Sequence, residues 1–237
     1  MIDLHSHILF GLDDGARDID ESIKIIKKMA EYGINKVIAS PHFMEGVYNN
    51  KIEIIKERIM ILQESIKRED IDIEIFSGAE FYMELVILDL IKNNDIITIA
   101  DGNRYVLLEL PMGQIPICSE KILFVLLTKG LIPIIAHPER NHEVIKDPKR
   151  VKEWIDNGVL IQINGGSLVG RYGTTVRKSA ERLLIEGYTY NIASDSHSDY
   201  HPYLFYKGVK RAEKLIGKED VDNMVNKNPE KILSTSV

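Results

Sequence analysis

The feature that most constrains the fold is the alternation of short apolar segments with longer amphipathic ones along the chain. Seven segments have the length and apolar character of buried strands. They lie at Ile2–His5, Val37–Ser40, Ile71–Phe76, Tyr105–Leu110, Ile132–Ala136, Val159–Ile163 and Tyr188–Ala193. Strands separated by helices form a parallel sheet, because each helix carries the chain back to the start of the next strand. The pattern therefore predicts an α/β fold.

The intervening segments carry the start and stop signals of helices. Asp18 and Glu21 form a capping-box pattern, and Gly33 is placed to end the helix that follows. Further helices are predicted at Ile52–Ile66, at Ile122–Leu127, from Pro148 to Gly158, from Thr174 to Gly187, and over Tyr203–Asn226 with a break at Gly217. No internal repeat and no low-complexity linker interrupts this pattern, so we expect residues 1–237 to form a single domain.

Nearly every predicted strand ends in a histidine or a carboxylate. His5 and His7 are two residues apart, so in extended chain they point to the same side. Both an open doubly wound sheet and a barrel fit the alternation, but an open sheet spreads its strand ends along a line. A closed barrel gathers them around one pocket. We therefore expect an α/β fold of the distorted TIM-like (β/α)7 barrel type.

The residues at these strand ends are the ligand types of a metal site. They are His5, His7, Asp14, His42, Glu80, Glu109, His137, Asp195 and His197. Taken singly, each residue could have a structural or solvent-exposed role instead. Glu109, for example, interrupts an apolar run and could pair with Arg104 or Arg140 rather than with a metal. Imidazoles and carboxylates without thiolates suit Mn, Fe or Zn at a catalytic site. Nine ligands exceed the needs of one ion, so we expect two or three ions that share a carboxylate.

Composition excludes several other classes of protein. The net charge is −6 and no basic block is present, which disfavours a nucleic-acid partner. Cys118 is the only cysteine, so no intrachain disulfide forms, and it lacks the C-x5-R loop of cysteine phosphatases. We therefore expect Cys118 to have a structural role. We expect no signal peptide before the first strand. We also expect no membrane insertion, because the longest apolar runs are too short to span a bilayer. These features predict a cytoplasmic protein.

With these residues assembled, the sequence resembles the polymerase and histidinol phosphatase (PHP) superfamily. It is particularly similar to the bacterial manganese-dependent protein-tyrosine phosphatases of the CpsB/YwqE type, which act with tyrosine kinases in capsule and exopolysaccharide synthesis. The matching stretches cover nearly the whole chain in order. They are Met1–His7, Asp13–Gly15, Ser40–His42, Gly78–Glu80, Tyr105–Pro111, Ile134–Arg140 and Ala193–His197.

The resemblance implies a PHP-type barrel with a trinuclear site. By position, the first ion would be held by His5, His7, Glu80 and Asp195, the second by Glu80, Glu109 and His137, and the third by Asp14, His42 and His197. Arg140 matches an arginine that binds the substrate phosphate. Relatives carry a second arginine shortly after the D-x-H motif, where this chain has none, and either His201 or Arg171 could substitute.

The function that follows is metal-dependent hydrolysis of phosphotyrosine by a metal-activated hydroxide. The expected partner is a phosphotyrosine protein, in particular a bacterial tyrosine kinase that controls capsule or exopolysaccharide synthesis. Arg140 would neutralise charge on the phosphate, and His42 or His197 could donate a proton to the leaving group. Two alternatives stay open: a phosphoesterase of the same superfamily that acts on histidinol phosphate or another small molecule, and a non-catalytic metal-binding regulatory partner.

Overall fold

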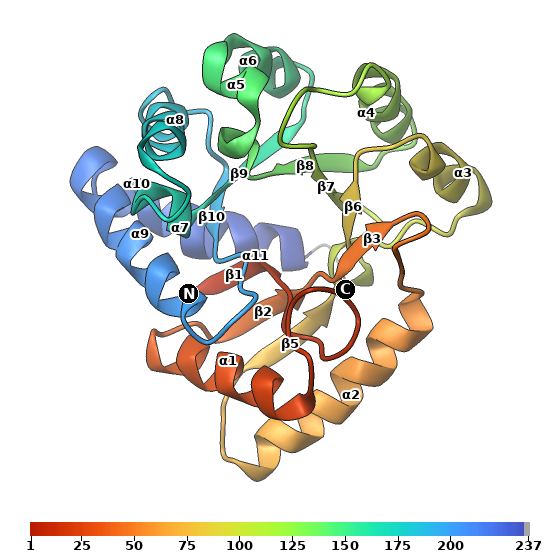
Figure 1. The fold of residues 1–237 in the computed structure, drawn as a ribbon, viewed down its shortest axis with the longest axis vertical. Helices are drawn as coiled ribbons and strands as arrows, with labels where there is room; N and C mark the ends of the chain where they lie inside the picture. Colours follow the sequence, from red (N-terminus) through yellow and green to blue (C-terminus); the bar gives the residue numbers. More distant parts are fainter. Residues whose placement is uncertain (235–237) are drawn as a thin grey trace.

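The structure is a computed structural model that describes residues 1–234 and has a mixed α/β architecture (Figure 1). Ten strands lie in this part of the chain. They are β1 (Ile2–Ser6), β2 (Lys36–Ala39), β3 (His42–Met44), β4 (Tyr48–Asn49), β5 (Glu74–Ser77), β6 (Glu80–Tyr82), β7 (Tyr105–Glu109), β8 (Ile132–Ala136), β9 (Leu160–Asn164) and β10 (Asn191–Ala193). All seven predicted strands are present, with boundaries that differ by up to three residues.

Most of the helices surround the strands, and the last one, α11, passes behind them (Figure 1). They are α1 (Ile19–Glu31), α2 (Ile52–Arg68), α3 (Val86–Asn93), α4 (Ser119–Thr128), α5 (His142–Lys146), α6 (Lys149–Asp156), α7 (Gly165–Leu168), α8 (Thr174–Ile185), α9 (His201–Ile216), α10 (Lys218–Asp222) and α11 (Asn228–Leu233). Two 3-10 turns, Ile99–Asp101 and Pro138–Arg140, and a π-helical turn, Asn223–Lys227, complete the described chain. The capping role of Asp18 is confirmed, because its carboxylate accepts a hydrogen bond from the backbone N–H of Glu21.

Hydrogen bonding divides the strands between two sheets. The first has the order β1-β2-β5, and the second has the order β10-β9-β8-β7-β6-β3-β4. All pairs are parallel except the hairpin β3–β4. The sheets meet where β1 lies beside β10, because His7 N–H donates to Ser196 O (2.9 Å) and Asp195 N–H donates to His5 O (3.0 Å).

Three strands, β3, β4 and β6, were not predicted. β3 follows β2 after only Ser40 and Pro41, and β6 follows β5 after only Gly78 and Ala79. β2 pairs with β5 in the first sheet, and β3 pairs with β6 in the second. Gly78 permits this transition, since a Cβ atom there would lie 2.7 Å from Cγ2 of Ile38. Each of these strands has only two or three residues, which is too short for a hydrophobic period to mark it as a strand.

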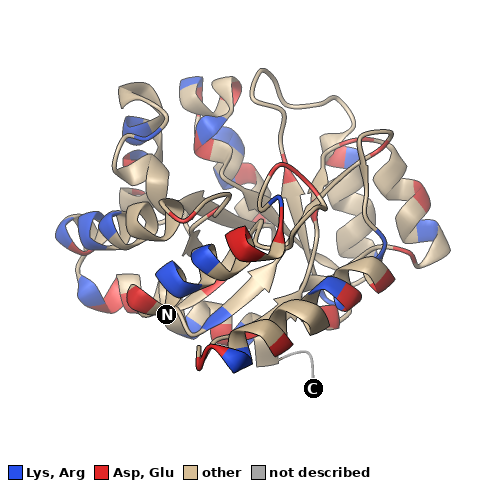
Figure 2. Ribbon diagram, turned by 60° about the horizontal axis from the view of Figure 1, so that its bottom comes forward, with Lys and Arg blue, Asp and Glu red and all other residues tan. Residues whose placement is uncertain are grey.

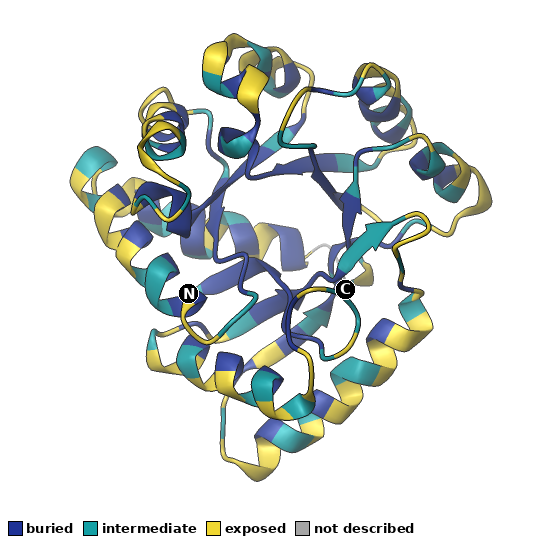
Figure 3. Cartoon of the chain, in the orientation of Figure 1, coloured by how far each residue is buried: buried dark blue, intermediate teal, exposed yellow. Residues whose placement is uncertain are grey.

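Most strands are buried on both faces, although β3 and β4 are only partly covered, and the helices are exposed on their outer sides (Figure 3). The outer faces carry Lys and Arg interspersed with Asp and Glu, often as pairs one helical turn apart (Figure 2). This mixture of charges agrees with the absence of a basic block in the sequence. Within residues 1–234, no helix combines the length and the apolar character that crossing a bilayer requires.

Candidate metal centre

Seven of the nine predicted ligand residues lie near the carboxyl-terminal ends of strands or in the loops that follow, and the other two, His42 and Glu80, are the first residues of β3 and β6. All nine come together in four overlapping groups whose ligand atoms lie within 4.8 Å of one another. The groups are His5, His7 and Glu80; His5, His137 and Asp195; His42, Glu80 and Glu109; and His7, Asp14, His42 and His197. The predicted convergence of distant segments on one place is therefore confirmed.

Glu80 occupies the middle of this cluster and is fully buried. Its Oε2 atom lies 3.2 Å from Nε2 of His5, 3.3 Å from Nε2 of His7 and 3.0 Å from Nδ1 of His42. Its Oε1 atom lies 3.0 Å from Nε2 of His137. One carboxylate thus faces four imidazoles, which is the arrangement expected of a bridging ligand.

Asp195 approaches the same centre from the end of β10. Its Oδ1 atom lies 3.6 Å from Nε2 of His5 and 3.4 Å from Nε2 of His7. Its Oδ2 atom accepts hydrogen bonds from Nδ2 of Asn164 (2.7 Å) and Nη1 of Arg140 (3.3 Å). The φ angle of Asp195 is +52°, in the left-handed region that costs a non-glycine residue energy and that recurs at functional sites.

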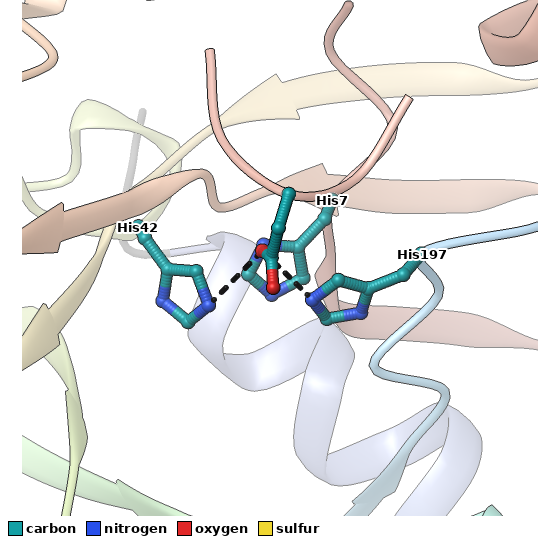
Figure 4. A group of neighbouring side chains, drawn as sticks. His7, His42 and His197 are labelled. Atoms are coloured by element: carbon teal, nitrogen blue, oxygen red, sulfur yellow. Dashed lines mark ion pairs between the residues drawn. The ribbon is translucent and has the colours of Figure 1, made fainter. Parts of the chain in front are cut away.

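The outer part of the centre is open to solvent. The rings of His7, His42 and His197 face a common point (Figure 4), and Oδ1 of Asp14 lies 3.5 Å from Nε2 of His42 and 3.3 Å from Nε2 of His197. The rings of His7 and His197 stack with their centroids 3.9 Å apart. His7 is buried whereas Asp14 is exposed, so this group joins the interior of the cluster to its surface.

Glu109 lies at the end of β7, 3.7 Å from both His42 and His137. Burial, and secondarily the negative charge of Glu80, raises the pKa of Glu109 to about 8. Arg140 is the arginine whose charge acts on this carboxylate, whereas Arg104 is exposed before β7 and lies over the ring of Tyr105. A carboxylate in this position requires additional positive charge to be ionised at neutral pH.

The donor set fits divalent cations. Oε2 of Glu80 and Nδ1 of His42 are buried and lie 3.0 Å apart, yet neither atom makes a well-formed hydrogen bond. All nine side chains offer nitrogen or oxygen, the ligand atoms that Mn, Fe and Zn accept at catalytic sites. Unpartnered buried acceptors beside several imidazoles are costly in a metal-free protein, and cations would satisfy them.

A cavity of about 430 Å³ opens over the centre. Besides the metal ligands, its lining contains Arg140, Arg171, Tyr172, Ser198 and His201. The guanidinium group of Arg140 lies over the ring of Tyr172, 4.4 Å from its centroid, and that of Arg171 lies 5.5 Å from it. Two cationic side chains therefore face the space beside the ligands.

His201 and Arg171 differ in what they can offer an anion. Nδ1 of His201 lies 3.0 Å from the backbone N of His197 and 2.8 Å from the backbone O of Asp195. Burial lowers the pKa of His201 to about 4, so its ring is neutral at pH 7. A guanidinium group offers an anion several N–H donors and a positive charge, which makes Arg171 the better of the two substitutes that the sequence suggested.

Several functional neighbours of the ligands were not predicted from the sequence. They are Asp13, which hydrogen bonds to His7; Gln162, which contacts His5; Asn164, which donates to Asp195; and Tyr172, which contacts Arg140. Asp13 carries a partial signal, because it stands in the Asp13–Gly15 stretch that matched the family. The other three have no local pattern that separates them from ordinary strand or loop residues.

An α/β fold with a cluster of imidazoles and carboxylates beneath an arginine-lined cavity defines a candidate metal-dependent hydrolase. The chain belongs to the CpsB/CapC family, described as "Capsular polysaccharide synthesis, CpsB/CapC", which matches residues 1–234.

Curated relatives carry names that agree with this family. The sequence is 34% identical over 198 residues to the putative tyrosine-protein phosphatase CapC of Staphylococcus aureus, covering 84% of this chain and 77% of that protein. It is 32% identical over 237 residues to the tyrosine-protein phosphatase YwqE of Bacillus subtilis, covering 98% of this chain and 91% of that protein. It is 30% identical to the tyrosine-protein phosphatase CpsB of Streptococcus pneumoniae, covering 98% of each chain.

Solved structures support the same grouping. One solved structure aligns with this chain with a TM-score of 0.93 and 31% identity. It belongs to a set of crystal structures of YwqE from B. subtilis and CpsB from S. pneumoniae, which are described as unique metal-dependent tyrosine phosphatases. It covers 100% of this chain and 96% of that one. A histidinol phosphate phosphatase from Lactococcus lactis aligns with a TM-score of 0.57 and 14% identity, over 89% of this chain and 93% of that one, and shows a likeness of fold alone.

Proposed function

We propose that this protein is a metal-dependent protein-tyrosine phosphatase that hydrolyses the phosphate monoester of phosphotyrosine. The observation that carries the proposal is the single cluster of nine nitrogen and oxygen ligands beneath a cavity that also contains Arg140 and Arg171. The names and the described metal dependence of relatives with about 30% identity support it.

The metals are proposed to be two or three Mn²⁺ ions, and Fe or Zn would fit the same donors. The first ion would be held by His5, His7, Glu80 and Asp195, the second by Glu80, Glu109 and His137, and the third by Asp14, His42 and His197. The central position of Glu80, with one oxygen toward His5 and His7 and the other toward His137, supports its role as the carboxylate shared by the first two ions.

When bound, such ions neutralise phosphate oxygens and lower the pKa of a water molecule toward neutrality. The side chains of the protein supply the remaining requirements. Arg140 and Arg171 would bind the non-bridging oxygens of the phosphate, and Asp195 and Tyr172 hold Arg140 in place for this contact.

The tyrosine leaving group needs little acid catalysis from the protein. A phenol has a pKa of about 10, so the phenolate leaves without a strong general acid. A proton, where one is needed, would come from His42 or His197, which both line the cavity, provided that the ring is not fully occupied by an ion. The partly exposed position of these rings supports exchange of that proton with solvent.

The scaffold is proposed to be a single PHP-type domain, a distorted TIM-like (β/α)7 barrel. The ring of neighbours β1, β2, β5/β6, β7, β8, β9 and β10 supports this description, with the backbone hydrogen bonds between β1 and the end of β10 as its closing contact. The substrate is proposed to be a bacterial tyrosine kinase of capsule or exopolysaccharide synthesis, in line with the family description. The cytoplasmic location stays a prediction from the single cysteine.

The experiment compares a phosphotyrosine peptide with histidinol phosphate as substrates of the purified protein, with metal content measured in parallel. We expect bound Mn²⁺, preferred turnover of the peptide, and loss of activity on chelation with recovery on addition of Mn²⁺. Preferred turnover of histidinol phosphate would support the small-molecule phosphoesterase instead. Metal-loaded protein that hydrolyses no aryl phosphate would support a non-catalytic regulatory partner.

A thiol reagent separates this chemistry from that of cysteine phosphatases. Cys118 lies just before α4 and does not line the cavity over the centre. Alkylation of Cys118, and the Cys118→Ser variant, should leave phosphotyrosine hydrolysis within about twofold of the unmodified protein. Inactivation by alkylation with all metal retained would contradict the proposal.

A further inference from the structure

Asp13 lies directly behind His7, on the side of the imidazole ring that faces away from Glu80. Oδ2 of Asp13 accepts a hydrogen bond from Nδ1 of His7 at 2.6 Å. Both side chains are completely buried. Because neither group reaches solvent, this contact determines the orientation of the ring.

The Asp13 carboxylate is itself held by the backbone on two sides. Oδ2 also accepts from the N–H of His42 (3.0 Å), and Oδ1 accepts from the N–H of Gly15 (2.9 Å). All three partners of Asp13 are therefore donors. Gly15 permits this arrangement, since a Cβ atom there would lie 2.1 Å from the carbonyl oxygen of His7.

The opposite nitrogen of His7 faces the metal ligands. Its Nε2 atom lies 3.0 Å from Nε2 of His5, 3.3 Å from Oε2 of Glu80 and 3.4 Å from Oδ1 of Asp195. His7 belongs by distance to both the inner group and the outer group of ligands. With Nδ1 engaged by Asp13, only Nε2 remains free to bind an ion.

We propose that Asp13 is a positioning residue that commits His7 to a single ion through Nε2. This inference rests on the proposed metal-dependent function. It concerns which ligands bind which ion and not the chemical reaction. Asp13 places Nε2 of His7 beside His5, Glu80 and Asp195, and so leaves the outer ion to Asp14, His42 and His197. A hydrogen-bonded carboxylate behind a histidine ligand also makes the ring a stronger donor.

His5 provides an internal comparison. Its Nδ1 atom lies 2.8 Å from Nε2 of Gln162. His5 presents Nε2 to an ion only with this amide turned over, so that Oε1 of Gln162, which has no other hydrogen-bond partner, accepts from Nδ1. The partner of His5 is neutral, whereas that of His7 is ionised. The charged contact is the stronger of the two, and its loss should affect metal binding more.

The test titrates Mn²⁺ into metal-free wild type, Asp13→Asn and Asp18→Asn, and counts the ions bound per chain. Asn offers one oxygen where Asp13 serves three donors, so at least one N–H loses its acceptor. We expect Asp13→Asn to weaken Mn²⁺ binding about 10–100-fold. Asp18→Asn is the control, because it removes the same negative charge at the N-cap of α1, where Asn caps as well as Asp. This variant should bind Mn²⁺ with the affinity of the wild type.

A second measurement uses only the wild-type protein, so it decides the question even if Asp13→Asn does not fold. Nitrogen-15 NMR of the imidazole groups with Zn²⁺ bound should show the proton of His7 on Nδ1 and the metal on Nε2. Zinc on Nδ1 of His7, or equal Mn²⁺ affinity of folded Asp13→Asn and Asp18→Asn, would overturn the inference. Wild type that binds no ions would instead refute the proposed function.

Discussion

Nε2 of His5 and Nε2 of His7 lie 3.0 Å apart, and both point at the same oxygen of Glu80. Two imidazole nitrogens at this separation cannot both carry a proton without a close contact between the hydrogens. A cation between them and Glu80 would convert this contact into coordination. The arrangement is therefore one that metal binding should stabilise.

The first prediction concerns this stabilisation. At a Mn²⁺ concentration of about 100 times Kd, binding adds about 2.7 kcal/mol to the free energy of unfolding. For a chain of 237 residues this corresponds to a Tm increase of about 5–10 °C, which differential scanning fluorimetry can measure. His5→Ala should lose most of the increase, whereas His142→Ala, at an exposed histidine on α5, should keep it. An unchanged Tm of the wild type would contradict the prediction.

The second prediction concerns Glu80. Replacing it with Gln removes the one charge that faces four imidazoles, so the protein should retain fewer ions per chain. Phosphotyrosine hydrolysis should fall at least about 100-fold, because two ions share this ligand in the proposed site. Inductively coupled plasma mass spectrometry and a peptide assay measure the two effects. The matched control is Glu84→Gln, which changes a carboxylate that accepts a hydrogen bond from the backbone N–H of Glu45. This control should keep its ions and its activity. Full ion content in Glu80→Gln would argue against a bridging role.

The third prediction concerns Tyr172, whose ring lies 4.4 Å from the guanidinium carbon of Arg140. A cation–π contact is worth about 0.5–2 kcal/mol, so Tyr172→Leu should raise KM for a phosphotyrosine peptide about 2–30-fold. Tyr172→Phe keeps the ring and should change KM by less than about threefold. Metal content should be unchanged in both variants. Equal KM values for the Leu and Phe variants would show that the ring does not position Arg140.

The fourth prediction concerns Glu139, which is fully buried and accepts hydrogen bonds from the backbone N–H of Asn164 (2.9 Å) and the hydroxyl of Ser167 (2.6 Å). Burial raises its pKa from 4.5 to about 7. A carboxyl group with a raised pKa favours folding below pH 4.5, and this contribution is lost as the pH rises through about 7. Each pKa unit corresponds to about 1.4 kcal/mol, so the effect is about 3 kcal/mol.

Glu139→Gln isolates this effect, because the amide stays neutral at every pH. In chelator-treated protein, the variant should be more stable than wild type by about 1–3 kcal/mol at pH 8, with the difference disappearing near pH 4.5. Urea unfolding at several pH values measures it. Glu143→Gln, at an exposed position on α5, should show no such trend. A constant difference between Glu139→Gln and wild type from pH 4.5 to 8 would contradict the assignment.

The main ligands could be predicted from the sequence because the fold class fixes where strand ends go. A histidine such as His137, directly after four apolar residues, lies at the end of a buried strand, and parallel strands deliver their ends to one side. The short strands that contain His42 and Glu80 could not be predicted, because pairing with neighbours, rather than an apolar run, creates them.

The partners of the ligands were harder to foresee. Asp13 and Asp14 are adjacent and chemically identical, yet one is buried behind His7 and the other is exposed near His42 and His197. Only the path of the loop in three dimensions separates these roles. Gln162 and Tyr172 are likewise assigned by contacts with segments far away in the sequence.

The hydrogen bonds between β1 and the segment after β10 have a consequence for biosynthesis. His5 and His7 are translated about 190 residues before Asp195 and His197. A nascent chain therefore carries an incomplete set of donors until the segment after β10 has been synthesised. A chain that terminates before β10 would lack this strand and the donors that follow it, so it could not bind the full set of ions.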